Sequence, residues 1–302
     1  MKFIDPRIDF AFKKIFGSEE AKDILISFLE SLLGLEGARR IADLTFLDPF
    51  LAPKIKNLKY SVLDVKCRDH RGISYIVEMQ VQKTGAFLKR IQYNAAKTYV
   101  HQIERGEDYP KLNQVIAITI VDFILFDRFD HAVSRHASTE EMTGLSFLQD
   151  IVHYFIELPK WTGTLDARLS ILDQWIYFIK FAGSSETIPE QIRIEPIRHA
   201  FEMARVANMT AEEFELYEKA GIAIADARGA LELAREEGEK RGEERGERRH
   251  AIDTLRRLFN RKFGISLSEE NEDRLKTATL EEIESWTDRI LVAGSERDVF
   301  VP

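Results

Sequence analysis

The sequence contains a single cysteine, Cys67, among 302 residues, which excludes an internal disulfide. Such low cysteine content is typical of a reducing compartment, and Cys67 is interpreted as a small core residue rather than a nucleophile. The sequence also lacks any run of about 20 apolar residues, and Met1 to Pro6 lack the apolar stretch of a signal peptide. We therefore predict a cytoplasmic protein without a membrane partner.

Basic residues are fewer than acidic ones, and the formal net charge at pH 7 is −8. The charge is unevenly distributed along the chain. Residues 1–122 carry 19 Lys and Arg against 16 Asp and Glu, a net charge of +3, whereas residues 123–302 carry 24 against 35, a net charge of −11. The N-terminal part can therefore contact DNA, but strong sequence-independent binding at physiological salt is not expected.

Two short segments rich in β-branched, aromatic and aliphatic residues, 61–67 and 73–81, flank the sequence Arg-Asp-His-Arg-Gly at 68–72. This intervening sequence is typical of a turn, so the pattern predicts a β-hairpin. Successive residues of a strand point to opposite faces of the sheet. Glu78 and Gln80 therefore project together from one face.

A register in which paired residue numbers sum to 142 would set Asp64 opposite Glu78, with Cβ atoms roughly 5 Å apart. Two carboxylates so close repel unless a cation lies between them. Their oxygens suit Mg²⁺, Mn²⁺ or Ca²⁺ better than Zn²⁺. The alternative, favoured by composition alone, is a solvated sheet face without a function. Against it, Glu78 lies in the apolar run Tyr75–Met79, which is typical of a central strand, where a carboxylate is costly unless it is paired or metal-bound.

Periodicity predicts the surrounding elements in the order α-β-β-β-α-β, followed by further helices. The C-terminal part of the chain is predicted to be helical. The predicted elements are a helix from a cap at Asp5-Pro6 to Phe16, a helix with an apolar stripe from Ile24 to Leu33, a strand or extended segment over 41–52, a helix over Phe87–Glu104, a central strand over Gln114–Phe126 and an added strand over Ile151–Glu157.

This pattern resembles the PD-(D/E)XK nuclease superfamily and, more specifically, the Rpn family of recombination-promoting nucleases and transposases. The resemblance covers most of residues 1–180 and implies an α/β fold with a restriction-endonuclease-like core and added strands and helices. The residues that carry it are Asp9–Gly17, Leu63–Val65, Gly72, Val77–Gln80, Phe87, Arg90, Tyr93, Tyr99, Gln102, Gly106, Tyr109 and Ile156–Trp161.

The resemblance implies that Asp64 and Glu78 are catalytic and hold a divalent metal, with Mg²⁺ expected and Mn²⁺ or Ca²⁺ as alternatives. It also implies that Gln80 acts on the attacking water or the phosphate. The commonest family pattern has lysine at this last position, and an amide cannot supply its positive charge. Asp9 is a candidate third ligand, or simply a first-turn acid that is stabilised by the helix dipole.

We expect Lys66, Arg90 and Tyr93 to bind the substrate, with Lys89 as a further candidate for phosphate contact. The resulting prediction is a metal-dependent DNA endonuclease that hydrolyses phosphodiester bonds and promotes recombination or accompanies mobile elements. The alternative is a weak or inactive protein of the same fold that acts as a DNA-binding or oligomeric interaction module.

Four segments are predicted along the chain. They are a nuclease-like domain over 1–160, a helical extension over 161–225, a charged helical linker over 226–250 and a small helical module over 251–302. Of the 15 residues from Arg235 to Arg249, 6 are acidic, 6 are basic and 3 are glycine, at a spacing of four. A solvated helical linker is the favoured interpretation, and the alternative is a homodimer in which two copies of this helix pack closely.

Overall fold

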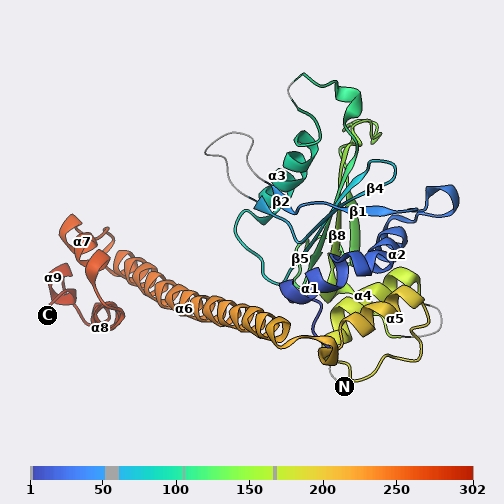
Figure 1. Ribbon diagram of the computed structural model, residues 1–302. Helices are drawn as coiled ribbons and strands as arrows, with labels where there is room; N and C mark the ends of the chain where they lie inside the picture. The colour runs from blue at the N-terminus through green and yellow to red at the C-terminus, as the bar shows by residue number, and fades with distance from the viewer. Residues whose placement is uncertain (1–2, 52–60, 105, 166–168, 302) are drawn as a thin grey trace. The chain divides into compact units, whose positions relative to one another are not determined.

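Six strands form one sheet in the order β1-β4-β5-β6-β8-β7 in this computed structural model (Figure 1). The structure describes residues 3–51, 61–104, 106–165 and 169–301. β5, β6 and β8 run parallel to one another, whereas β1, β4 and β7 pair antiparallel. The strands of the sheet are β1 (Leu44–Phe46), β4 (Val65–Asp69), β5 (Ser74–Gln80), β6 (Val115–Val121), β7 (Val133–His136) and β8 (Ile151–Glu157), and β2 (Phe50–Leu51) pairs separately with β3 (Ser61–Val62).

β4 and β5 form the predicted hairpin in the predicted register. Val65 pairs with Val77, so the paired residue numbers sum to 142. β5 lies between β4 and β6, and its residues from Ser74 to Met79 are all buried. The hairpin and the central position of β5 are therefore confirmed. The structure adds that β4 begins only at Val65, because Asp64 occupies a bend just before it.

The parallel strands at the centre of the sheet require long connections, and a helix supplies the first of them. α3 (Phe87–Val100) links β5 to β6, as is usual for parallel neighbours. β6 is a continuous apolar run in which every residue is buried, as expected for a strand covered on both faces. The strand predicted as an addition over Ile151–Glu157 is β8, which lies inside the sheet between β6 and β7.

Helices cover both faces of this sheet (Figure 1). On one face, Val77 and Met79 of β5 join the largest hydrophobic core. On the other, Ile76 lies in a smaller core with residues of α3. This alternation confirms that Glu78 and Gln80 lie on the face that α3 covers. The helices whose buried residues belong to the largest core are α1 (Asp9–Phe16), α2 (Lys22–Leu33), α4 (Ile171–Phe181) and α5 (Glu195–Met203).

The helices α4 and α5, which follow the sheet, belong to the same compact unit as the sheet. Trp175 of α4 is fully buried and packs against the rings of Phe16 and Phe28, at centroid distances of 5.8 and 6.1 Å. The chain divides into two compact units, Met1–Ala225 and Asp226–Pro302. Packing is therefore continuous across residue 160, where the first predicted segment ends, and the four-segment division stays a prediction.

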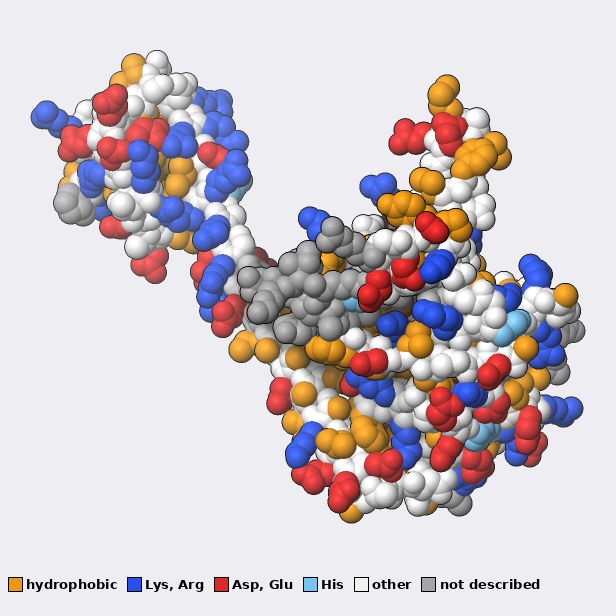
Figure 2. All heavy atoms as spheres, turned by 45° about the horizontal axis from the view of Figure 1, so that its top comes forward, with side chains coloured by type: hydrophobic (Ala, Val, Ile, Leu, Met, Phe, Trp, Pro, Cys, Tyr) orange, Lys and Arg blue, Asp and Glu red, His pale blue; other side chains and the backbone are white. Residues whose placement is uncertain are grey.

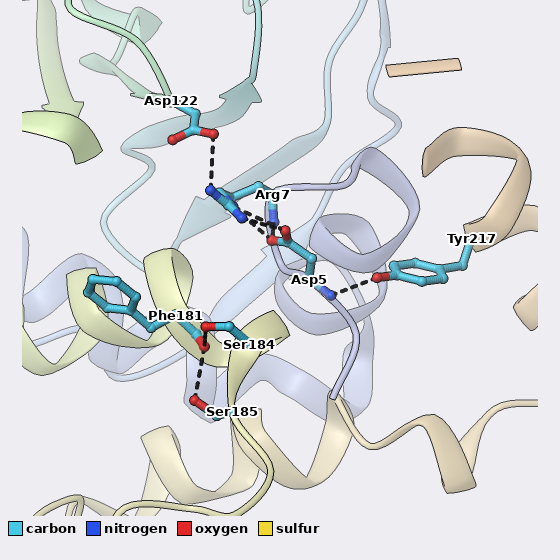
Figure 3. A network of polar contacts seen from close by, with 7 residues as sticks. All are labelled: Asp5, Arg7, Asp122, Phe181, Ser184, Ser185 and Tyr217. Carbon is cyan, nitrogen blue, oxygen red and sulfur yellow. Dashed lines mark hydrogen bonds and ion pairs between the residues drawn. The ribbon is translucent and has the colours of Figure 1, made fainter. Parts of the chain in front are cut away.

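The N-terminal segment is held to the first unit by a polar network (Figure 3). Arg7 donates to both carboxylate oxygens of Asp5, and its Nη1 lies 3.1 Å from Oδ2 of Asp122, which directly follows β6. The backbone N–H of Asp5 donates to the hydroxyl of Tyr217. The predicted cap at Asp5-Pro6 is wrong, because α1 begins at Asp9 and the Asp5 carboxylate is engaged by Arg7.

The second unit is helical and has its own small core, which confirms the predicted helical C-terminal region. Leu255 and Phe259 of the long helix α6 are fully buried there, beside Trp286. The linker glycines Gly238, Gly242 and Gly246 are not closely packed against other described residues, because a Cβ added at any of them would meet no atom within 4 Å. None of the helices in the described part of the chain is long and apolar enough to cross a membrane. The helices of the second unit are α6 (Ala211–Phe263), which begins in the first unit, α7 (Glu269–Thr277), α8 (Leu280–Ile290) and α9 (Glu296–Val299).

Candidate active site

Glu78 is a buried carboxylate near the C-terminal end of β5. Its side chain faces α3, and only 5% of the residue is exposed. The amide Nδ2 of Asn94 on α3 donates a 3.1 Å hydrogen bond to Glu78 Oε1. Burial raises the pKa of Glu78, while the charge of Arg90 and the Asn94 hydrogen bond act in the opposite direction. Glu78 is therefore a carboxylate whose charge the fold itself compensates only in part.

Asp64 is held beside the end of β5 by the backbone. The N–H of Met79 donates a 2.8 Å hydrogen bond to Asp64 Oδ2, and the Asp64 side chain is only 12% exposed. The pKa of Asp64 is raised to about 7, chiefly by burial and also by the charges of Asp9 and Glu78, while the Met79 N–H and Lys13 act in the opposite direction. The fold thus places two buried carboxylates near enough to repel each other.

Lys13 is a site residue that sequence reasoning missed. Its Nζ lies 2.7 Å from Asp9 Oδ1 and 3.6 Å from Asp64 Oδ1, so it stands between the two carboxylates. Asp9 and Lys13 are four residues apart on α1, and this spacing is the signal that could have identified the pair. The Asp9 side chain is 57% exposed, and its role as a third ligand stays a prediction.

Gln80 is paired with an arginine from α3. Arg90 Nη2 donates a 2.8 Å hydrogen bond to Gln80 Oε1, and the guanidinium also lies over the ring of Phe87 at 5.4 Å. Asn94, one helical turn after Arg90, is the second residue that sequence reasoning missed. The spacing of four along α3 sets both side chains toward β5, so the positive charge of Arg90 lies directly beside the Gln80 amide.

The other expected substrate-binding residues lie away from these contacts. Lys66 pairs with Ile76 in the hairpin and so shares the face of Glu78, but its Nζ donates to the backbone carbonyl of Asp48 at 3.4 Å. Burial lowers the pKa of Lys66. Tyr93 is 39% exposed on α3. Substrate binding by Lys66 and Tyr93 therefore stays a prediction.

The chemistry of these groups fits a hard divalent cation. Asp64 and Glu78 supply oxygen atoms in a buried setting that penalises their charge, and a cation between them would relieve it. Within the described ranges, no group of three or more His, Cys, Asp or Glu side chains is placed to hold one metal. Two protein carboxylates, completed by water and substrate phosphate, are a usual ligand set for Mg²⁺.

Comparison with known proteins identifies one family. A family model described as "PD-(D/E)XK nuclease family transposase" matches residues 6–234. No curated protein and no solved structure matches the chain. The matched range includes the whole sheet, both carboxylates and the helices on both faces, and it ends within α6.

Proposed function

Because this chain belongs to the PD-(D/E)XK nuclease family transposases, we propose that it is a divalent-metal-dependent nuclease that hydrolyses DNA phosphodiester bonds at Asp64 and Glu78. One observation carries the proposal. The two buried carboxylates, one just before β4 and one on β5, repel each other, and the ion pair of Asp64 with Lys13 at 3.6 Å and the charge of Arg90 beside Glu78 offset their charge only in part. Such an arrangement is costly for a merely structural site and is typical of a metal-binding one.

In the proposed mechanism, different residues of the chain hold the metal, orient the attacking water and bind the phosphate. When bound, a divalent ion supplies Lewis acidity toward the phosphate and lowers the pKa of a coordinated water. Asp64 and Glu78 would hold it, and the Met79 N–H fixes the first of these carboxylates. Gln80 would orient the attacking water through its amide, and Arg90 beside it would bind a phosphate oxygen.

Asn94 acts in this proposal by positioning Glu78. Because it donates to Glu78 Oε1, we expect Asn94→Ala to lower cleavage about 10- to 100-fold, as is usual when a group that orients a metal ligand is removed. The matched control is Thr98→Val, one turn later on α3, which removes a buried hydroxyl that has no hydrogen-bond partner among the described residues. Equal cleavage rates in Asn94→Ala and wild type, both folded, would contradict the role of Asn94.

The direct test is cleavage of supercoiled plasmid with and without divalent metal. We expect nicking in Mg²⁺ or Mn²⁺, none in EDTA, and full recovery when metal is restored, because water activation requires the ion. Ca²⁺ serves as a further comparison, since it binds oxygen ligands with a longer and more flexible geometry. Cleavage that persists in EDTA would exclude the metal-dependent mechanism.

A second candidate function is favoured by one departure from the common family pattern. Gln80 stands where lysine is usual. The second candidate is therefore an inactive relative that binds DNA or assembles with a second copy through α6. Calorimetric titration with Mg²⁺ or Mn²⁺ measures metal binding, and together with the plasmid assay it distinguishes the two candidate functions. DNA binding without metal uptake and without cleavage would favour this second function, as would a concentration-dependent dimer in sedimentation.

A further inference from the structure

A basic groove lies in the second compact unit, outside the range that the family model matches. It encloses about 380 Å³ between the C-terminal part of α6 and the end of α7. Five of its lining side chains are basic and one is acidic. These lining residues are Arg245, Arg248, Arg249, Arg256, Lys276 and Asp253.

The basic charge is concentrated in one part of the unit. Residues 245–262 carry 7 Lys and Arg against 2 Asp and Glu, a net charge of +5. The whole unit, residues 226–302, carries 15 against 19, a net charge of −4. In Figure 2, several Lys and Arg side chains lie along one edge of this unit, and others lie among acidic side chains across its visible face. The positive surface is therefore a local feature and does not follow from the overall composition.

Some of the basic side chains in the groove are already engaged within the fold. Arg248 donates to the backbone carbonyls of Leu275, Lys276 and Ala278, and so holds the end of α7 against α6. Arg256 is paired with Glu272 on α7. These residues build the wall of the groove and stabilise it.

Arg245 and Arg249 differ from their neighbours. Both are exposed, and the described structure gives neither of them an ion pair or a hydrogen bond. They are four residues apart on α6, so their charged groups lie side by side and repel each other. An anion with several oxygen atoms stabilises two adjacent guanidinium groups beside a basic wall, and phosphate is one of the groups that arginine binds with paired hydrogen bonds.

We propose that this groove binds the phosphate backbone of DNA through Arg245 and Arg249. The inference rests on the proposed function in one respect, since DNA is the polyanion that a nuclease of this family acts on. The second unit is then a DNA-holding module that contacts the substrate without reading its sequence. This contact raises the affinity of a chain whose overall charge opposes DNA binding.

The test compares two double variants of the full chain by fluorescence anisotropy with a labelled duplex. All proteins carry Glu78→Gln and are measured in EDTA, so that cleavage does not enter the readout. Arg245→Gln with Arg249→Gln removes the two unpaired charges. The matched control, Arg235→Gln with Arg241→Gln, changes the charge of the same helix equally, but at residues already paired with Glu239 and Glu237.

We expect the groove variant to bind roughly 10- to 30-fold more weakly at 0.15 M salt, and its salt dependence to fall by about two units of slope, since each phosphate contact contributes about 0.9. The control variant should bind like the parent protein. Equal losses in both variants, or no loss in either, would overturn the proposal. So would a loss of self-association with unchanged DNA binding, which would assign the groove to an acidic surface of a second copy.

Failure of this inference is distinguishable from failure of the proposed nuclease function. Binding that depends on Arg245 and Arg249, with no plasmid cleavage by wild-type protein, would support the groove and reject the nuclease. Metal-dependent cleavage with unchanged binding in the groove variant would support the nuclease and reject the groove.

Discussion

Glu78→Gln and Asp64→Asn are each expected to reduce plasmid cleavage by more than about 100-fold, a larger loss than that caused by removing a group that only orients a metal ligand. The same variants should be at least as stable as the wild type when no metal is present. This combination distinguishes a metal site from a carboxylate that stabilises the fold through an ion pair, such as that of Asp64 with Lys13, because breaking a buried ion pair destabilises a protein.

The stability gain follows from the direction of the pKa shifts. The fold raises the pKa of Asp64 to about 7, above the usual value of an aspartate in an unfolded chain. The ionised form is therefore penalised in the folded state, and this group lowers the free energy of unfolding progressively as pH rises from about 4 to about 7. An asparagine has no such penalty, and its carbonyl oxygen can still accept the N–H of Met79.

Urea unfolding in EDTA measures this difference. At pH 8 we expect Asp64→Asn to exceed the wild type by about 1 kcal/mol or more, and the two proteins to converge near pH 4, where the wild-type carboxyl is protonated. Asp127→Asn, which changes an exposed aspartate, is the matched control and should alter neither stability nor cleavage. A loss of stability of several kcal/mol in Asp64→Asn, or retained cleavage, would show that Asp64 is a structural residue.

Much of the fold around Glu78 could be predicted because it depends on local rules. The turn sequence sets the hairpin, and strand alternation then assigns Glu78 and Gln80 to one face, whatever packs there. The apolar stripe of α2 follows from the helical period in the same way. Its predicted members Ile24, Leu25, Phe28, Leu29 and Leu32 are buried, and Leu33 is partly buried.

The side-chain partners in the site were not predictable in this way. Lys13 reaches Asp64 from a helix 51 positions earlier in the chain, and Asn94 reaches Glu78 from α3. Such contacts depend on the angle at which a helix crosses the sheet, which no local pattern specifies. The bend at Asp64 is a further example, since the hydrogen bond from Met79 that holds it forms only in the assembled hairpin.

Glu157→Gln is expected to lower the free energy of unfolding by about 3 to 5 kcal/mol, because it breaks a buried ion pair at the end of β8. The Glu157 side chain is 1% exposed and lies 2.7 Å from the Nζ of Lys160, whose side chain is 8% exposed. Glu157 Oε1 also accepts the backbone N–H groups of Leu125 and Phe126. The carboxylate thus fixes the segment that follows β6, and its loss leaves a buried ammonium group without its counter-charge.

A double-mutant cycle separates the pair from its surroundings. Lys160→Met should be destabilising alone, since it leaves the carboxylate buried and unpaired, but Glu157→Gln with Lys160→Met should recover part of the loss, because neither charge then remains. Glu215→Gln is the control, since its pair with Lys219 is about two-thirds exposed and should contribute less than about 0.5 kcal/mol. Strictly additive losses in the double variant would show that the two side chains act separately. Recovery would show that the fold requires their charges to balance more than it requires either one.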